Sequence, residues 1–498
     1  MRERVGGSFW GDQPALPAGA ILVRSPRGLS AAIETSAGRP VVIWSGRDQD
    51  AASVGQTVGD NSDAWHVLES AERLVCDRAD PIALIAAIKG VPIQIIEPDG
   101  RLSNDDRTAA RLVEQVFPVG VGYACPFTGR SLTIVEAIEL CGFWRRLIDS
   151  NRDIAGGYGF AFWKKQAVAP LLWNGSEPFR FFSTAAEAGP GSPVAIWRAR
   201  TPRSIVAELE AAGTLLVEVE DGFLRSRGLG ADCVPPLSIV VDRLGPYFDP
   251  GQPSELETLL QEGQFDEALI ERAAALRRRI IDAGLGKYES GSETAPRFGG
   301  DRRHILIPGQ VEDDRSVLTG GAGLESNMEL LRQVRAAAPD AYLIYKPHPD
   351  VLAGHRKGSA QDSEALEHAD RIVTDLPIAA LIDMADEVHV NTSLTGFEAL
   401  LRGKPVTTHG VPFYAGWGLT TDLGPVPGRR TARRPIDELV AAALLVYPRY
   451  LDPVTGLPCP AEIAVDRLTE TQADRVDLLV ALRRLQGRLM KGFRSLAR

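Results

Sequence analysis

The sequence predicts an α/β protein with parallel sheets and crossover helices. Short aliphatic and β-branched runs alternate with helical segments along most of the chain, which is the pattern of such sheets. With 498 residues the chain is too long for one ordinary core, so we expect two to four domains. Polar, glycine-containing segments follow several predicted strands, at the end where open α/β sheets bind ligands. The pattern therefore favours a ligand-binding protein made of several α/β units.

The N-terminal region is predicted to form a small α/β unit. Short apolar runs predict four strands, at residues 21–23, 41–44, 74–76 and 93–96. Residues 133–171 follow, and their pattern is helical and rich in aromatic side chains.

Two further α/β units are predicted after residue 193. The first has expected strands at residues 194–197, 215–219 and 237–241. A long helix is expected to begin at Ser254, because Ser254 and Glu257 have the spacing of a capping box. A linker at residues 284–300 leads to the second, with expected strands at residues 304–307, 342–345, 371–373 and 388–390.

Residues 73–93 and 387–406 have similar sequences, which suggests that the first unit is a degenerate copy of the last. An offset of 313 positions (403 − 90) aligns Gly90 with Gly403, Asp80 with Ser393, and Ala83 with Gly396. The first copy lacks the serine, threonine, glycine and glutamate set of the second, so we expect no chemistry there. Chance similarity between two α/β segments is the alternative.

Composition and charge exclude several classes of function. A net charge of −10 argues against general nucleic-acid binding, because no basic excess exists to displace counterions. None of the five cysteines forms a CxxC pair, so we expect neither a metal site of the zinc type nor a disulfide framework. No signal peptide and no apolar run of roughly 20 residues is recognisable, which predicts a cytoplasmic protein.

The C-terminal segment, residues 478–498, has no acidic residue and alternates arginine or lysine with leucine and phenylalanine. On a helix this places a basic face beside an apolar face, which is typical of helices at a membrane surface. A terminal helix packed on its own domain, with its arginines in water, is the alternative.

Two segments that follow predicted strands of the last unit have the composition of phosphate sites. Lys346 and His348 lie in a Lys-Pro-His-Pro sequence that ends with Pro349, and both side chains can donate hydrogen bonds to phosphate. Ser393 and Thr395 lie where another strand is expected to pass into a helix, whose free N–H groups suit an anion. A rigid turn in the first case and simple N-capping in the second are the alternatives.

Three more residues of this unit are candidates for the same site. Gly396 continues the serine and threonine turn, and Glu398 lies in the first turn of the expected helix, where it would suit a ribose diol. A favourable position in the helix dipole is the alternative for Glu398. Gln310 follows the first strand of the unit and could face the same cleft, and a polar surface loop is the alternative, which this segment by itself favours.

An acidic cluster ends a predicted strand of the middle unit and precedes a basic, glycine-rich loop. Asp221, directly before Gly222, is the best placed to act as a nucleophile or base at a sugar carbon. Arg225 and Arg227 could then bind an acidic sugar. A turn with surface charges is the alternative.

Taken together, these segments resemble the bacterial capsule-polysaccharide β-Kdo transferases, the KpsC-like capsule biosynthesis proteins. The matching segments are residues 220–226, 228–230, 235–238, 310–314, 345–350, 392–400 and 412–420. They occur in the family's order, and the last is long and rich in rare residues, so it is specific.

The resemblance implies a GT-B type glycosyltransferase with two Rossmann-like domains facing a cleft. It implies CMP-β-Kdo as donor, no metal or other cofactor, retention of the β configuration, and a lipid-linked Kdo or oligosaccharide acceptor at the inner face of the inner membrane. Other capsule assembly proteins are further expected partners. Retention suggests a double displacement with Asp221 as nucleophile.

Carried over by motif, the other residues are expected to bind the nucleotide sugar. His348, as a second catalytic residue, and Lys346 would hold the CMP phosphate next to Pro349, with Ser393, Thr395, Gly396 and Gln310 beside them and Glu398 near the ribose. Some family members carry two complete transferase modules, whereas only one is recognisable here, so a single linkage is expected.

These expectations divide the chain into four parts. They are a degenerate α/β unit at residues 1–165, a catalytic and acceptor domain at 166–298, a nucleotide-sugar domain at 299–430, and C-terminal helices with a basic tail at 431–498. Two other functions stay open: transfer of another nucleotide-activated sugar in a surface-glycan pathway, and a non-catalytic role in capsule assembly or export.

Overall fold

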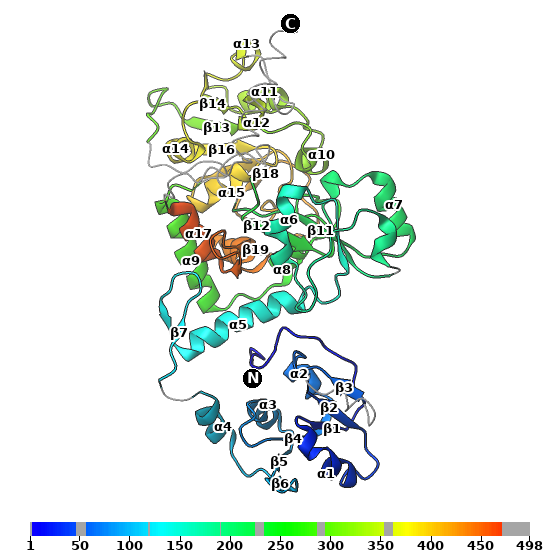
Figure 1. The fold of residues 1–498 in the computed structure, drawn as a ribbon. Coiled ribbons are helices and arrows are strands. Elements are labelled where there is room, and N and C mark those ends of the chain that lie inside the picture. The colour runs from blue at the N-terminus through cyan, green and yellow to red at the C-terminus, as the bar shows by residue number, and fades with distance from the viewer. Residues whose placement is uncertain are drawn as a thin grey trace. The chain divides into compact units, whose positions relative to one another are not determined.

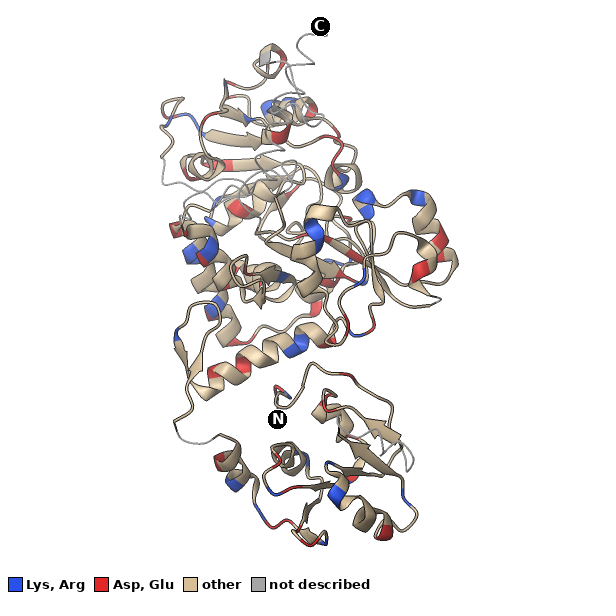
Figure 2. Cartoon of the chain, viewed as in Figure 1, with Lys and Arg blue, Asp and Glu red and all other residues tan. Residues whose placement is uncertain are grey.

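The computed structural model describes residues 2–45, 56–117, 120–189, 191–224, 234–285, 294–352 and 362–470. The chain divides into two compact units (Figure 1). The first unit consists of Met1–Asp153 and Leu172–Phe179, and the second of Ile154–Leu171 and Arg180–Arg498. Basic and acidic residues are interspersed along both units (Figure 2). Among the described residues, no helix combines the length and the apolar character needed to span a bilayer.

The first unit is built on a six-stranded sheet, the first sheet, in the order β3-β2-β1-β4-β5-β6. Its strands are β1 (Ala20–Val23), β2 (Val41–Trp44), β3 (Gln56–Val58), β4 (Ala71–Cys76), β5 (Ile93–Ile96) and β6 (Leu102–Asn104). All pairings are parallel except that of β5 with β6. The four strands expected in this region are confirmed, and the two short edge strands were missed.

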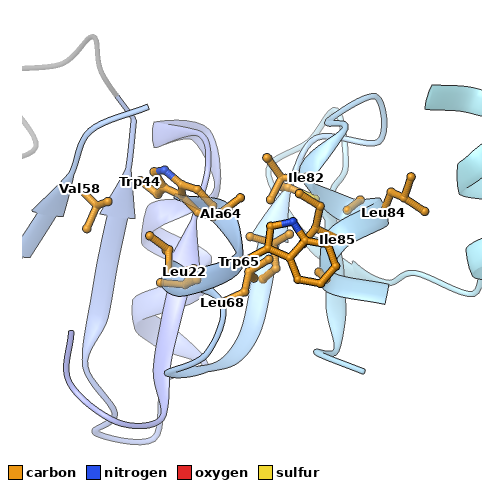
Figure 3. Packing of buried hydrophobic residues seen from close by; sticks show 14 of the residues in the cluster. Leu22, Trp44, Val58, Ala64, Trp65, Leu68, Ile82, Leu84 and Ile85 are labelled. Carbon is orange, nitrogen blue, oxygen red and sulfur yellow. The ribbon is translucent and has the colours of Figure 1, made fainter. Parts of the chain in front are cut away.

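Alternating residues of the first sheet pack on opposite faces, as strand geometry requires. Leu22 and Trp44 face one side, where α2 (Ala64–Val67) and α3 (Ile82–Lys89) cover them (Figure 3). Ile21 and Val23 face the other side, under α1 (Leu29–Glu34). The long helix α5 (Ile134–Asp149) begins with a capping box between Thr133 and Glu136.

The second unit contains two sheets. The middle sheet has the order β20-β19-β12-β11-β10-β9. Its strands are β9 (Gly156–Tyr158), β10 (Val194–Ile196), β11 (Leu216–Asp221), β12 (Ser238–Asp242), β19 (Pro448–Leu451) and β20 (Pro458–Cys459).

The expectation of parallel pairing is wrong for half of the middle sheet. Strands β9, β10 and β11 are parallel, but β12, β19 and β20 pair antiparallel. Every residue of β12 is buried. A strand that is buried on both faces has a continuous apolar run whether it pairs parallel or antiparallel, so the sequence pattern could not give its direction. Strands β19 and β20 come from the segment expected to be helical, where α16 (Ile436–Val440) and α17 (Ala461–Thr469) do form.

The third sheet is entirely parallel, in the order β15-β14-β13-β16-β17-β18. Its strands are β13 (His304–Pro308), β14 (Tyr342–Lys346), β15 (Arg371–Ile372), β16 (Glu387–Val390), β17 (Val406–Thr408) and β18 (Thr421–Asp422). Helix α11 (Asn327–Ala337) covers one face, and α14 (Ile378–Met384) and α15 (Leu394–Leu401) cover the other (Figure 1). Because β14 and β16 lie on opposite sides of β13, a topological switch point lies between β13 and β16.

The long helix expected from Ser254 is two helices, α8 (Glu255–Glu262) and α9 (Glu267–Asp282), separated at Gly263. Ser254 caps α8 by accepting from the Glu257 N–H group at 3.1 Å. The Glu257 carboxylate does not close a capping box, because it pairs with Arg429 and Arg430. Arg434 donates hydrogen bonds to the carbonyls of residues 260, 261 and 263. These carbonyls at the C-terminal end of α8 would otherwise have no partner within the helix.

The middle sheet, which is mixed, and the third sheet, which is parallel, lie within one compact unit, as the GT-B expectation of two α/β domains requires. The first unit adds a separate α/β sheet to it.

Candidate functional site

Asp221 is the last residue of β11, and its side chain is about one-third exposed. Lys164 of α6 (Phe162–Val168) donates to Asp221 Oδ1 at 2.8 Å. The same ammonium group lies 3.5 Å from the ring centroid of Trp197, which follows β10. The structure thus holds the predicted nucleophile in a charge-assisted hydrogen bond at the C-terminal end of a strand.

Glu220 precedes Asp221 and faces different partners, because neighbouring strand residues point to opposite faces. Arg315, at the start of α10 (Arg315–Gly320), donates to Glu220 Oε1 at 3.2 Å. Burial, and then the nearby charge of Asp221, raise the pKa of Glu220 to about 8. Burial therefore favours the protonated form of Glu220 at neutral pH.

An aromatic cluster around Phe223 joins three of the sequence motifs. The Phe223 ring lies 4.5 Å from that of Phe413 and 6.2 Å from that of Phe397, measured between centroids. Tyr247 lies 4.9 Å from Phe223 in an edge-to-face arrangement. The segment directly after Asp221 therefore packs against the third sheet's α15 and against the motif at residues 412–420.

At the switch point of the third sheet, the Gln310 side chain is held by Thr392. Its amide donates to Thr392 Oγ1 at 3.0 Å, and its carbonyl accepts from the Thr392 N–H at 2.9 Å. Ser393 caps α15 by accepting from the Thr395 N–H at 3.2 Å, and its own hydroxyl donates to Thr395 Oγ1 at 3.1 Å. Gln310, Ser393 and Thr395 are thus brought together at the edge where nucleotides bind in such sheets.

Gly396 allows a close approach of Tyr414. A Cβ atom at position 396 would lie 2.2 Å from the Tyr414 hydroxyl oxygen. That hydroxyl donates to the Ser393 carbonyl at 2.5 Å. Burial, followed by the charges of Glu398 and Asp422, raises the pKa of Tyr414 well above its usual value. Tyr414 is therefore a neutral buried donor that holds the turn before α15.

The Lys-Pro-His-Pro segment follows β14, at the same edge of the third sheet. The His348 Nδ1 atom accepts from the Asp350 N–H at 3.2 Å, which leaves Nε2 as the protonated nitrogen of the neutral ring. Pro349 is the first residue of α12 (Pro349–Leu352). Lys346 is buried, and its Nζ donates to the Leu376 carbonyl at 2.6 Å.

A mainly apolar pocket lies in the second unit, and Ile280, Leu285, Leu444 and Leu468 form part of its lining. Phe223 and Leu224 line it from the segment after β11, and Leu394, Phe397 and Glu398 line it from α15. A second pocket is lined mainly by polar residues, among them Gln310 and Asn391. Glu398 of α15 therefore shares a pocket with Phe223 and Leu224, which follow Asp221.

Two predicted residues, Arg225 and Arg227, lie outside the described residues. Two residues that contact the acidic pair, Lys164 and Arg315, were not predicted from the sequence, and neither was Trp197, which contacts Lys164. Lys164 is 57 positions from Asp221 and Arg315 is 95 positions from Glu220, so no local pattern connects them.

Comparison with known proteins agrees with the motifs. A family model described as capsule polysaccharide biosynthesis protein matches residues 194–450, just over half of the chain. The chain belongs to this family. The match includes both β11, with Asp221, and the whole of the third sheet, and it confirms the resemblance noted from the sequence.

Curated relatives extend the similarity. The capsule polysaccharide modification protein LipA of Neisseria meningitidis serogroup A is 38% identical over 378 residues, which cover 74% of this chain and 53% of LipA. The lipopolysaccharide-processing protein LpsZ of Rhizobium meliloti is 48% identical over 252 residues, which cover 50% of this chain and 57% of LpsZ. The chain spans about half the length of the curated relatives it matches.

Two solved structures share the fold. Thermosulfurimonas dismutans KpsC, beta Kdo 2,4 transferase, is 31% identical with a TM-score of 0.55, and the match covers 64% of this chain and 98% of that one. The beta Kdo 2,7 transferase of KpsC is 35% identical with a TM-score of 0.51, covering 63% and 98%. The GT-B prediction is thereby confirmed.

Proposed function

We propose that this protein is a retaining β-Kdo glycosyltransferase that uses CMP-β-Kdo in capsule polysaccharide biosynthesis. The observation that carries the proposal is the position of Asp221, which lies at the end of β11 and is ion-paired with Lys164. Directly after it, Phe223 and Leu224 line a pocket together with Glu398 of the third sheet. Family membership and similarity to proteins named Kdo transferases support the assignment.

In the proposed first step, an Asp221 oxygen attacks the anomeric carbon of Kdo. The bond between that carbon and the phosphate oxygen breaks, and CMP leaves with the electron pair. In the second step the acceptor hydroxyl attacks the same carbon, the ester bond to Asp221 breaks, and the hydroxyl proton passes to water. Two inversions retain the β configuration. Neither step requires a metal.

The third sheet is proposed to bind the CMP moiety. His348 would donate from Nε2 to the phosphate and stabilise the charge of the leaving group, with Ser393, Thr395 and the first N–H groups of α15 beside it. Glu398 would accept from the ribose hydroxyls. Lys346, whose ammonium group is bonded to a main-chain carbonyl, would act through its charge or by holding the loop that carries His348 and Pro349.

The acceptor is proposed to be a lipid-linked Kdo or oligosaccharide at the inner face of the inner membrane, reached from the cytoplasm. The basic segment at residues 478–498, which lies outside the described residues, is the candidate for contact with that membrane.

A trapping experiment tests this function. The protein is incubated with CMP-β-Kdo in the absence of acceptor, and its peptides are analysed by mass spectrometry. We expect release of CMP and a Kdo adduct on the peptide that contains Asp221. Calorimetric titration with CMP and with UDP tests the nucleotide, and we expect CMP to bind more tightly. Tighter binding of UDP, with no adduct, would favour a transferase of another activated sugar.

A further inference from the structure

We propose that Lys164 and Trp197 form a subsite for the carboxylate of the donor sugar, directly beside Asp221. This inference rests on the proposed function and deepens it, because it assigns the residue that selects an acidic sugar over a neutral one.

The geometry places one cation at the predicted point of bond formation. Lys164 Nζ lies 2.8 Å from Asp221 Oδ1 and 3.5 Å from the centroid of the Trp197 ring. The Lys164 side chain is only 13% exposed and Trp197 is buried, so both the ion pair and the cation–π contact are partly shielded from water. Lys164 is therefore held in one place rather than sampling solvent.

A donor of the Kdo class poses an electrostatic problem at this place. Its anomeric carbon is bonded to a carboxylate, so the sugar's own negative charge must come within a few ångströms of the Asp221 carboxylate during attack. Like charges at that separation repel strongly in a partly buried site. A cation that already contacts Asp221 is placed to contact both carboxylates and to offset the repulsion.

The same cation keeps the charge balanced through the reaction. When Asp221 forms the ester bond to the anomeric carbon, it loses its negative charge, and the anion facing Lys164 disappears. The carboxylate of an acidic sugar is bonded to that carbon and can take its place. A neutral sugar brings no such replacement, so the covalent intermediate is stabilised only for an acidic donor.

The other carboxyl group close to Asp221 does not compete for this role. Glu220 bonds to Arg315 of α10, and burial keeps it mostly protonated near neutral pH. Glu218 pairs with Arg198, whose guanidinium is thereby occupied. Among the residues that the structure describes, Lys164 is thus the cation that contacts Asp221 directly.

Three substitutions in α6, which remove or keep a positive charge, test the subsite. Lys164→Met removes the charge, Lys164→Arg keeps it, and Lys165→Met is the matched control. Lys165 is the next residue of the same helix and lies over the Phe181 ring at 5.1 Å. For each variant, affinities for CMP and for CMP-β-Kdo are measured by calorimetry without acceptor, and kcat/KM is measured by CMP release with acceptor.

We expect Lys164→Met to lower kcat/KM for CMP-β-Kdo by about 100-fold and to abolish the extra affinity of CMP-β-Kdo over CMP. Its affinity for CMP alone should not change, which also shows that the variant is folded. Lys164→Arg should restore most of the activity, and Lys165→Met should behave as wild type. Lys164→Met with wild-type kcat/KM would overturn the subsite while leaving the transferase proposal intact. A wild-type protein that releases no CMP from CMP-β-Kdo would instead overturn the proposed function.

Discussion

The first and third sheets have the same strand order but differ in what occupies the switch point. In both, the first strand of the unit lies at the centre, the chain passes to one side for two strands, and it returns to the other side for the last three. The offset of 313 positions found in the sequence also aligns one segment of the two sheets, around α3 and α15. It pairs β5, which begins at Ile93, with β17, which begins at Val406.

Helix starts and ends correspond as well. Asp80 accepts from the N–H two residues on, at 2.9 Å, at the start of α3, and Ser393 does the same at 3.2 Å at the start of α15. Gly90 and Gly403 end the two helices with φ angles of 75° and 70°. This strand order is common among nucleotide-binding sheets, so descent from one ancestor stays a hypothesis.

The difference lies in the side chains at the ends of the strands. Arg24 follows β1 and bonds Asp80 at 3.0 Å, Asp60 at 2.9 Å and the Trp44 carbonyl at 3.1 Å. Its guanidinium also stacks over the Trp44 ring. In the third sheet Gln310, which follows β13, bonds the neutral Thr392 instead. In the first sheet, the Arg24 guanidinium is therefore bonded to carboxylates of the protein itself. In the third sheet, hydroxyl and N–H groups stand at the start of α15, where a ligand is proposed to bind.

The largest expected effect is on transferase activity, which should depend on Asp221 and not on the first sheet. Asp221→Asn keeps the size of the side chain but removes the nucleophilic charge, so transfer from CMP-β-Kdo should fall by about 1,000-fold or more. Asp80→Asn, in the first sheet, should leave transfer unchanged. Initial rates of CMP release measure both. Equal losses in the two variants would mean that the first sheet takes part in catalysis.

A second effect concerns pH. Burial, Asp221 and Glu218 raise the pKa of Glu220 to about 8 in the folded protein, well above its unfolded value, although Arg315 and Lys164 act in the opposite direction. The contribution of Glu220 to stability is therefore fully present below pH 4.5 and is lost as pH rises to 8, by at most about 1.4 kcal/mol per pH unit.

Glu220→Gln should remove this loss. The free energy of unfolding of the second unit is measured for both proteins between pH 5 and 8, with hydrogen exchange reporting the two units separately. We expect the difference between variant and wild type to grow with pH in the second unit and to stay constant in the first. Parallel pH profiles in the second unit would show that Glu220 ionises normally.

The third prediction uses an aligned pair of small residues. Gly396→Ala places a Cβ against the Tyr414 hydroxyl and should cost about 1–3 kcal/mol of stability. The first sheet already has Ala83 at the aligned position, where it is fully buried. Tyr414→Phe should restore part of the loss, because it removes the oxygen at 2.2 Å but leaves the ring atom Cζ 2.8 Å from the new Cβ. Urea unfolding of the single and double variants measures this, and additive losses would contradict it.

The smallest expected effect concerns the two helix caps. Ser393→Ala should cost about 1 kcal/mol of stability, because it removes an acceptor at a helix start. Asp80→Ala should cost more, because it also removes the ion pair with Arg24. Only Ser393→Ala should also weaken CMP binding, by about 10-fold. Calorimetry with CMP separates the outcomes, and weaker binding in the Asp80 variant would place the nucleotide on the first sheet.

Much of this comparison was accessible from the sequence. Apolar runs located every central strand of the first and third sheets, because a strand buried on both faces needs such a run whatever surrounds it. The turn at Ser393 was recognisable because a hydroxyl residue before a helical segment caps it locally. The break at Gly263 was missed, because the arginine that satisfies the end of α8 comes from residue 434.

What the sequence by itself determined about this protein is its local structure and its family: the α/β alternation, the repeated segment and the motifs around Asp221, His348 and Ser393. Only the tertiary structure decided which charges meet. The pairing of Lys164 with Asp221, the proton on Glu220 and the antiparallel β12 and β19 depend on contacts between distant segments and on burial. Neither long-range contacts nor burial can be assigned to a short stretch of chain, because both arise only when the sheets have packed together.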